Sequence, residues 1–341
     1  MYAQDAKITA QRLFTLVLVF FLPLTGKSAL AQEKSDPWIA PPIPQQYAGL
    51  LGKGLDVDWA KTGKGMSSYS LQDVKSFKSA GLSHIRIRVK DEASKTLLKE
   101  LDIQIKDCVA NRLIPVLAYQ ANDFKNQPTD MNVNHVVAWW AAIAGHFKDA
   151  SPMLSFDLLI EATDAVNKAP DRLNVLYEKV VAAIRKTNPK RIVFISPRLR
   201  SDPAYLHELR IPSQHNNHLM AEWHFYASGP AKDNPNKLWT TGTPAEKQII
   251  LSKILAAKAW EQKTGILTWV GAWMPGNYNK ADEYTVAEQV VFARFVASAL
   301  DRAKIPFAVN SDTKFYDRDK KVWIAKLQPV LNVILHPNGE K

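Results

Sequence analysis

Residues 191–196 read RIVFIS, a run in which nearly every position is apolar. A strand with one solvated face alternates apolar and polar residues, whereas a strand of a parallel sheet is covered on both faces and is apolar almost throughout. The run therefore predicts a strand inside a parallel sheet. Because parallel neighbours need crossover connections, usually helices, strands and helices should alternate on either side of it.

This alternation extends over most of the chain. The segments with the length and composition of strands are GLDVDW (54–59), LSHIRIRV (82–89), RLIPVLAYQ (112–120), MLSFDLLIE (153–161), RIVFIS (191–196), HLMAEWHFY (218–226), GILTWVGAW (265–273) and IPFAVN (305–310). Most of the stretches between them carry apolar residues at helical spacing. Eight such units in about 280 residues match the size of a closed (β/α)8 barrel.

An open, doubly wound sheet is the alternative architecture. It usually has a glycine-rich turn directly after its first strand. The stretch GLDVDWAKTGKGM (54–66) contains glycines, but not at that spacing. We therefore predict an α/β fold with a single (β/α)8 TIM barrel over residues 54–341 and no second domain.

The first residues have the pattern of an export signal. Lys7 and Arg12 precede the apolar run LFTLVLVFFLPL (13–24), and small residues at 29–31 offer a cleavage site. A membrane helix is the alternative, but the run is shorter than the roughly 20 residues that span a bilayer. We expect a signal peptide over residues 1–31, cleavage near Ala31, a secreted or periplasmic protein, and no stable membrane insertion after cleavage.

The segment after the signal is proline-rich. KSDPWIAPPIPQ (34–45) lacks periodicity and predicts an extended N-terminal arm over residues 32–53. Beyond it, a hydrophobic content of 46% with 10% aromatic residues predicts a sizeable core. Cys108 is the single cysteine, so no intramolecular disulfide can form.

The formal net charge of +11 favours anionic partners. Basic residues are scattered rather than gathered in one block, which argues against a nucleic-acid groove, while anionic glycans or envelope surfaces stay open as partners. We expect a monomer and no cofactor. No phosphate loop, nucleophile elbow or short-range metal-ligand spacing occurs, so no metal site is predicted.

Polar residues gather where the predicted strands end. They are Asp56 and Asp58, Arg86 and Arg88, Gln120 and Asp123, Glu161 and Asp164, Glu222 with His224 and Tyr226, and Asn310 and Asp312. The carboxyl ends of barrel strands form one mouth, where active sites of such barrels lie. Because buried charges are costly unless paired, Arg86 should face Glu161 or Glu222.

Aromatic residues lie at the same ends. A cleft lined with aromatic rings and a few carboxylates suits a carbohydrate, because sugar rings present apolar faces that stack on such rings. Trp273 and Tyr226 are candidates for that contact, whereas core packing is the better expectation for Trp223 and Trp269. The strand-two cations Arg86, Arg88 and Lys90 make an acidic polysaccharide a better expected ligand than a neutral one.

With these residues, the chain resembles glycoside hydrolase family 5, the cellulase-like branch of the (β/α)8 glycosidases. Arg86 ends strand two as the family arginine does, and Glu161 in Ile-Glu-Ala (160–162) stands where the family has Asn-Glu-Pro. His224 and Tyr226 match the family's His-x-Tyr on strand six. The resemblance implies action on O-glycosidic bonds of a polysaccharide or oligosaccharide, with Glu161 as proton donor.

Three positions depart from the family. The histidine expected after strand three is replaced by Tyr119 or Gln120, and the tryptophan that ends strand eight is Asn310. On strand seven the family has Gly-Glu-Phe or Gly-Glu-Trp, whose glutamate is the nucleophile, and this chain has Gly-Ala-Trp (271–273). Ala272 cannot attack an anomeric carbon.

The missing nucleophile leaves several functions open. A retaining mechanism needs a second carboxyl about 5 Å from the first. Glu222 is the nearest substitute on strand six, although pairing with Arg86 is its alternative role. The barrel could instead cleave an acidic polysaccharide by β-elimination, or bind glycans without cleaving them.

We predict hydrolysis, with a pKa of Glu161 raised by its apolar neighbours. The predicted substrate contacts are Arg86, Gln120, His224, Tyr226, Trp273, Asn310 and Asp58.

Overall fold

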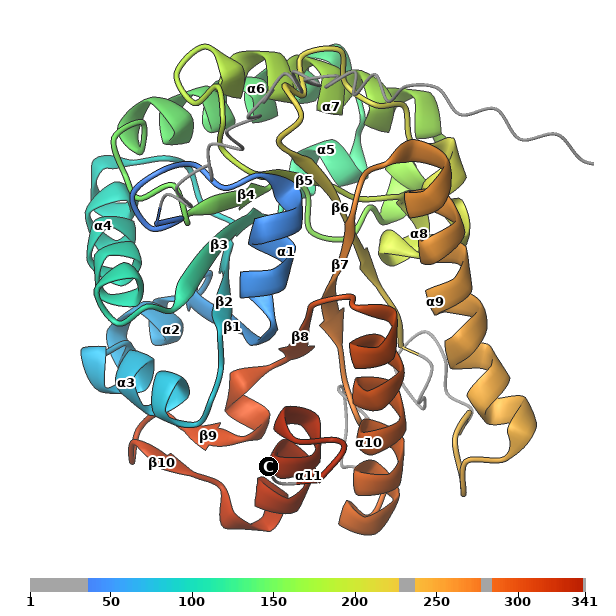
Figure 1. Ribbon diagram of the computed structural model, residues 1–341. Helices are drawn as coiled ribbons and strands as arrows, with labels where there is room; N and C mark the ends of the chain where they lie inside the picture. The colour runs from blue at the N-terminus through green and yellow to red at the C-terminus, as the bar shows by residue number, and fades with distance from the viewer. Residues whose placement is uncertain (1–35, 227–236, 277–283, 340–341) are drawn as a thin grey trace, which may run out of the picture. The chain divides into compact units, whose positions relative to one another are not determined.

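The computed structural model describes residues 36–226, 237–276 and 284–339 (Figure 1). Eight parallel strands close into a barrel in sequence order, with β8 paired to β1. They are β1 (Lys53–Ala60), β2 (His84–Val89), β3 (Ile114–Tyr119), β4 (Ser155–Asp157), β5 (Val193–Ile195), β6 (Leu219–His224), β7 (Thr268–Trp273) and β8 (Phe307–Asn310). The predicted (β/α)8 barrel is confirmed.

Helices connect the strands and surround the barrel. They are α2 (Gly63–Ser68), α3 (Leu71–Ser79), α4 (Lys95–Ala110), α5 (Asn122–Asn126), α6 (Asp130–His146), α7 (Pro170–Arg185), α8 (Arg198–Ser201), α9 (Pro244–Thr264), α10 (Val286–Ala303) and α11 (Gln328–Leu335). The link from β5 to β6 holds only α8 and the short 3₁₀ helix Pro203–Glu208. A two-stranded ribbon, β9 (Tyr316–Asp317) with β10 (Val322–Trp323), lies between β8 and α11 in the chain.

Local signals start and stop the longest helices. Thr243 at the beginning of α9 and Thr285 at the beginning of α10 each form a capping box with a glutamate three residues on, which satisfies backbone N–H groups that have no partner inside the helix. Gly265 ends α9 with a positive φ of 73°, a conformation that favours glycine. These caps determine where α9 begins and ends and where α10 begins.

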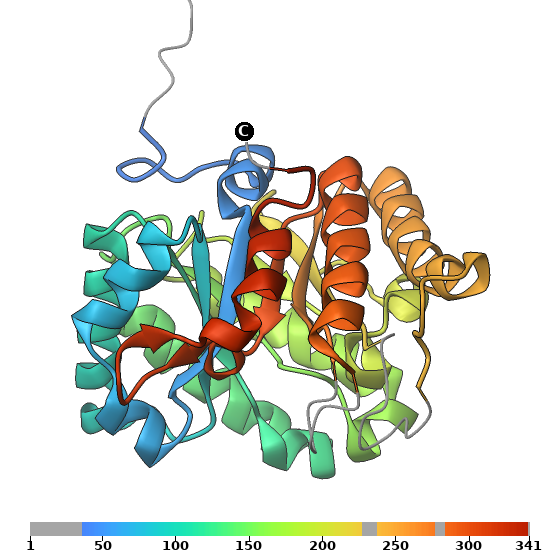
Figure 2. The same cartoon turned by 90° about the horizontal axis from the view of Figure 1, so that it is seen from below.

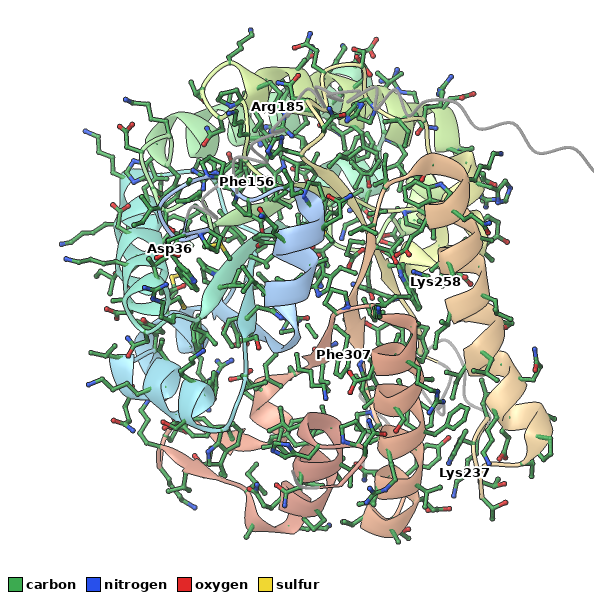
Figure 3. All side chains as sticks on the ribbon, viewed as in Figure 1. Asp36, Phe156, Arg185, Lys237, Lys258 and Phe307 are labelled. Carbon is green, nitrogen blue, oxygen red and sulfur yellow. The ribbon has the colours of Figure 1, made fainter. Side chains whose placement is uncertain are left out.

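The packing forms two shells. One cluster fills the inside of the barrel near the strand starts and includes Phe194, Met220 and Trp269. The larger cluster lies between the strands and the helices and includes Phe156 and Phe307, both labelled in Figure 3. The barrel is therefore a packed core rather than a pore, and only its ends are open to ligands.

The segment expected to be an extended arm is helical over α1 (Pro44–Leu51), so that prediction is wrong for these residues. Tyr47 and Leu51 of α1 are buried in the inner cluster, and the Tyr47 hydroxyl donates to Ser155 Oγ at 2.7 Å. Burial of this apolar face outweighs the turn-forming prolines, and Pro44 is tolerated in the first helical turn. Figure 2 shows α1 at one end of the barrel.

A bulge in β7 decides which side chains reach the mouth. Glu222 pairs with Trp269 and Trp223 with Val270, but His224 pairs with Ala272, so Gly271 is an extra residue in the strand. Paired residues point to the same side of a sheet, and Ala272 therefore shares the inner side with His224. Strict alternation would instead have placed Trp273 there.

The bulge overturns one predicted substrate contact. Trp273 is fully buried on the outer side, where its ring lies parallel to Phe225 with centroids 6.3 Å apart and edge-on to Phe307. It packs under α10 and presents no face to the mouth. Trp223 and Trp269 are both buried in the core as expected, although Trp269 lies inside the barrel.

Gly271 should tolerate no side chain. A Cβ on this residue would overlap the carboxylate of Glu222, which is itself completely buried. We expect Gly271→Ala to lower the free energy of unfolding by about 1–3 kcal/mol, the usual cost of overpacking a core. Urea denaturation measures it. Gly145→Ala in α6, where no neighbouring atom lies within 4 Å, is the control and should be neutral or slightly stabilising.

Candidate functional site

A buried cluster of Arg86 and three carboxylates lies at the bottom of the mouth. Arg86 is completely buried and donates from Nε and Nη2 to Asp157 Oδ2 at 2.8 and 2.6 Å, and from Nη2 to Glu222 Oε1 at 3.1 Å. The third carboxylate, Asp56, lies 3.7 Å away. The predicted pairing with Glu222 is therefore present. One cation shared by several buried carboxylates is a structural centre that no solvent or sugar reaches.

Asp157 is a site residue that the sequence analysis missed. It stands inside the apolar segment MLSFDLLIE (153–161), where a charged residue is anomalous in a strand covered on both faces, and that anomaly was the available signal. Burial raises the pKa of Asp157 to about 7 against the opposing charge of Arg86.

Glu222 lies too deep to touch a substrate. Its side chain is fully buried, and Oε1 contacts both Arg86 Nη2 and His224 Nε2. Removing this charge should leave Arg86 and His224 short of a counter-ion. We expect Glu222→Gln to cost about 3 kcal/mol or more in unfolding free energy.

Thermal or urea denaturation measures that loss. Glu92→Gln is the control, because Glu92 is exposed and its contact with His135 is at the surface. An unchanged stability together with a lost activity would instead assign Glu222 to the chemistry.

Glu161 is the carboxylate that reaches the opening, with 19% of its side chain exposed. Its Oε1 accepts from the Tyr226 hydroxyl at 2.9 Å and lies 3.0 Å from His224 Nδ1, while Oε2 lies 3.5 Å from Arg200 Nη1. His224 ends β6, Tyr226 follows it by two residues, and Arg200 lies in α8 after β5, whereas Glu161 lies in the loop after β4. The structure thus brings together Glu161, His224 and Tyr226, as the sequence predicts.

The predicted rise in the pKa of Glu161 is wrong. Burial alone would raise this pKa, but the hydrogen bonds and charges of His224, Tyr226 and Arg200 lower it to about 2. Ile160 and Ala162 are apolar, yet they do not surround the carboxylate, which faces polar groups from other strands. Glu161 is therefore ionised near neutral pH.

His224 sits between two carboxylates. Burial lowers its pKa, but the charge of Glu222 and the hydrogen bonds with Glu161 and Glu222 raise it to about 9. The imidazole is therefore protonated near neutral pH, with a proton on Nδ1 facing Glu161. Burial and the neighbouring Glu161 raise the pKa of the Tyr226 hydroxyl, which stays a donor.

Ala272 lies beside this group, buried at 1% exposure and in register with His224. Its side chain is a methyl group and brings no carboxylate to this side of the site. Three other carboxylates of the mouth are held by arginines: Asp56 Oδ1 lies 3.2 Å from Arg88 Nε, and Arg318 bonds both Asp58 and Asp312. Asp123 and Asp164, which also follow barrel strands, are exposed, and Asp164 accepts from the Thr163 hydroxyl at 2.6 Å.

The remaining predicted contacts are placed as follows. Gln120 Oε1 accepts from Lys125 Nζ at 2.9 Å, and Asp58 is half-buried against Arg318. Asn310 is buried in register with Asp56 on the inner side of the barrel. Arg88 forms an ion pair with Asp56 and donates to the carbonyl oxygen of Val57. Its charge is therefore less available to a ligand than the sequence suggests.

Further polar residues escaped the sequence analysis. Lys125 lies in α5 after β3, and Lys61 follows β1 directly. Arg200 lies in α8, and Arg318 follows β9. Only their positions after strands marked them, because neither their spacing nor a motif distinguishes them from the many surface lysines and arginines of this basic chain.

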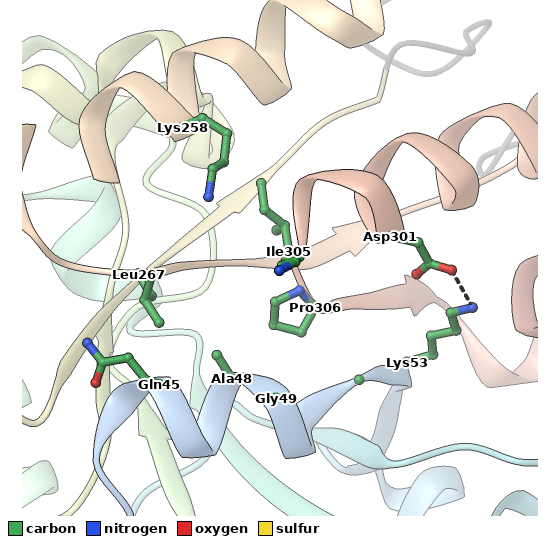
Figure 4. Close-up of a pocket in the computed structure, with 11 residues that line it drawn as sticks. Gln45, Ala48, Gly49, Lys53, Lys258, Leu267, Asp301, Ile305 and Pro306 are labelled. Carbon is green, nitrogen blue, oxygen red and sulfur yellow. Dashed lines mark hydrogen bonds and ion pairs between the residues drawn. The ribbon is translucent and has the colours of Figure 1, made fainter. Parts of the chain in front are cut away.

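A separate hollow of about 510 Å³ lies at the other end of the barrel (Figure 4). It is lined by Gln45 and Ala48 of α1, by Lys53 at the start of β1, whose amine contacts Asp301 at 2.9 Å, and by Pro306 just before β8. These positions precede the strands, so the hollow is distinct from the mouth that holds Glu161.

In the described ranges, no cluster of three or more metal-binding side chains is arranged to hold an ion. Within those same ranges, no helix has both the length and the apolar character that crossing a bilayer requires. The predicted signal peptide lies outside the described residues.

Known proteins share this architecture. A curated relative, endoglucanase H of Acetivibrio thermocellus, is 20% identical over 302 residues, covering 84% of this chain but 32% of the relative, so the chain spans about a third of its length. Among solved structures, a hyperthermophilic endo-β-1,4-glucanase in complex with substrate has a TM-score of 0.74 and 23% identity, covering 85% of this chain and 99% of that one.

Endoglucanase Cel5A of Thermotoga maritima has a TM-score of 0.75 and 20% identity, with 86% of this chain and all of that one covered. A cellulose synthase subunit of Clostridioides difficile has a TM-score of 0.73 at 18% identity over 83% and 99% of the two chains. These likenesses establish the fold. The model of the family "Cellulase (glycosyl hydrolase family 5)" matches residues 53–308, three quarters of the sequence, and the chain belongs to that family.

Proposed function

We propose that this protein is exported, binds a polysaccharide or oligosaccharide in the mouth of the barrel, and hydrolyses an O-glycosidic bond with Glu161 as proton donor. The observation that carries the proposal is the position of Glu161, a carboxylate at the opening held by His224 and Tyr226. Membership of a glycosidase family supports the reaction class.

A proton donor must hold a proton, and Glu161 is ionised near neutral pH. His224 supplies what is missing, because its protonated Nδ1 lies one hydrogen bond away, at 3.0 Å. In the proposed reaction this proton moves to Glu161 and then to the oxygen of the leaving sugar as the glycosidic bond breaks. Water bonds to the anomeric carbon, since Ala272 cannot form a covalent intermediate, and releases a proton to solvent, from which His224 regains the proton that it gave.

A second candidate is glycan binding without cleavage. It is favoured by two observations together: Ala272 offers no carboxylate beside His224, and the bonds of Glu161 to His224 and Tyr226 lower the pKa of Glu161. A site that keeps Glu161 ionised and neutralised binds hydroxyl groups well and protonates a leaving group poorly.

One experiment separates the two. The mature protein is incubated with a panel of neutral and acidic oligosaccharides in water enriched in oxygen-18, and the products are analysed by mass spectrometry while binding is measured by calorimetry. Hydrolysis places the heavy oxygen on the new reducing end. Binding without products supports the second candidate, a product with a new double bond indicates elimination, and no binding to any glycan would refute both.

Export is tested independently. N-terminal sequencing of the protein recovered from the periplasm or medium of an expressing bacterium should begin close to Gln32, after cleavage near Ala31. Full-length protein retained in the membrane would contradict it.

A further inference from the structure

Two of the cationic side chains around Glu161 have no ion-pair partner among the described residues. Arg86 is matched by Asp157 and Glu222, Arg88 by Asp56, Arg318 by Asp58 and Asp312, and His224 by Glu161 and Glu222. These pairs use the buried and half-buried carboxylates around Glu161, while Asp123 and Asp164 are exposed. Lys61 and Lys125 remain, and neither has a carboxylate within ion-pair distance in the part of the chain that the structure describes.

Lys125 is held in place by neutral groups. Its Nζ donates to Gln120 Oε1 at 2.9 Å and to the carbonyl oxygen of Ile160 at 3.1 Å, and only 5% of the residue is exposed. Burying an ammonium group on neutral acceptors is costly, and burial lowers the pKa of Lys125 to about 8 against the attraction of Glu161. The bond to Ile160, the residue next to Glu161, keeps this charge close to the carboxylate.

Lys61 comes from the end of β1, two strands away from β3 in the barrel. It follows β1 directly and is partly buried, and its charge interacts with Glu161, Asp56 and Asp58 without forming an ion pair with any of them. Its charge is also felt by Lys125. The two carboxylates nearest to it in sequence, Asp56 and Asp58, already pair with Arg88 and Arg318. The ammonium group of Lys61 can therefore bind an anionic group of an incoming ligand.

We infer that Lys61 and Lys125 form a cationic subsite beside Glu161 that selects glycans carrying an acidic group on the sugar, such as a carboxylate or a sulfate. The inference rests on the proposed glycan-binding function and gives it a substrate class. A neutral sugar would leave two desolvated ammonium groups without a counter-ion, whereas an acidic sugar neutralises them and offsets its own repulsion from Glu161.

This assignment differs from the one that the sequence suggested. The strand-two cations Arg86 and Arg88 are consumed by internal ion pairs, and Lys90 is exposed beyond the end of β2. The acidic group of the glycan would instead bind to Lys61 after β1 and Lys125 after β3, next to Glu161.

Calorimetry on the full chain tests the subsite with three oligosaccharides of equal length: a neutral one, one containing a uronic acid, and one carrying a sulfate. We expect at least one acidic oligosaccharide to bind about tenfold more tightly than the neutral one, the effect of one charge-assisted hydrogen bond. This preference should shrink as salt is raised. Tighter binding of the uronic acid or of the sulfate tells which acidic group is recognised.

Lys61→Met should weaken binding of the acidic oligosaccharide far more than binding of the neutral one and so remove most of the preference, and Lys61→Arg should keep much of it. Lys64→Met is the matched control, because the Lys64 side chain is 82% exposed and its charge is spent on Asp319 at 3.5 Å. A preference that survives Lys61→Met, or equal binding of all three ligands, overturns the inference and leaves the proposed function standing. Failure of every ligand to bind overturns the proposed function as well.

Discussion

Replacing Ala272 with glutamate should switch on retaining hydrolysis, raising the rate by about two orders of magnitude or more, equivalent to roughly 2.7 kcal/mol in the barrier. The β7 bulge turns residue 272 to the side occupied by His224, whose Nδ1 contacts Glu161. A carboxylate there would give Glu161 the nearby partner that a two-step mechanism needs.

The same substitution should change the protonation of Glu161. A second negative charge nearby disfavours ionisation, so the pKa of Glu161 should rise from about 2 towards the working pH. The acid that the wild-type site lacks would then be present without help from His224. We expect a bell-shaped dependence of kcat/KM on pH in the variant, with the alkaline limb reporting Glu161.

The measurement is the release of sugar from an activated aryl glycoside, with the anomer of the first product followed by NMR. Ala272→Gln is the control, since it fills the same volume without a charge. Activity in Ala272→Glu alone, with retained configuration, is the expected result. Equal rates in the two variants would mean that position 272 is not where a nucleophile can act.

Much of the architecture is readable from the chain. Strands such as Val193–Ile195 are apolar on both faces, and the capped helices between them leave few topologies besides the barrel. The departure of Gly-Ala-Trp (271–273) from the motif that the resemblance implies is also visible, because a motif of adjacent residues can be compared without knowing the register. Local pattern and composition suffice for features of this kind.

Other features depend on contacts between distant residues and escape the sequence. The extra residue at Gly271 reverses the side of Trp273, and periodicity gives no warning of a bulge. The low pKa of Glu161 arises from His224, Tyr226 and Arg200, which lie at least 39 positions away in the chain. A raised pKa was inferred from sequence neighbours, whereas spatial neighbours determine it.

Glu161→Gln should remove cleavage wherever cleavage occurs. A glutamine cannot transfer a proton to the leaving oxygen, and loss of a general acid typically lowers the rate by about 10²–10⁴-fold. The amide keeps the size of the side chain, so the barrel should fold. The comparison is made both in the wild-type protein and in Ala272→Glu, where an appreciable rate is expected, and an unchanged rate in both would exclude Glu161 from the chemistry.

The same variant has a second readout that needs no substrate. The pKa of Glu161 is lowered from 4.5 unfolded to about 2 folded, so its ionised form stabilises the fold above about pH 4.5, and this stabilisation is lost as the pH falls towards 2. Glu161→Gln lacks that contribution at every pH. The wild type should therefore be more stable than the variant at neutral pH, and the difference in unfolding free energy should shrink between pH 4.5 and 2. Asp130→Asn, at an exposed ion pair with Arg172, is the control and should show a smaller difference. A pH-independent difference for Glu161→Gln would mean that the carboxylate is not held by charged partners, and the proposed supply of its proton from His224 would fail with it.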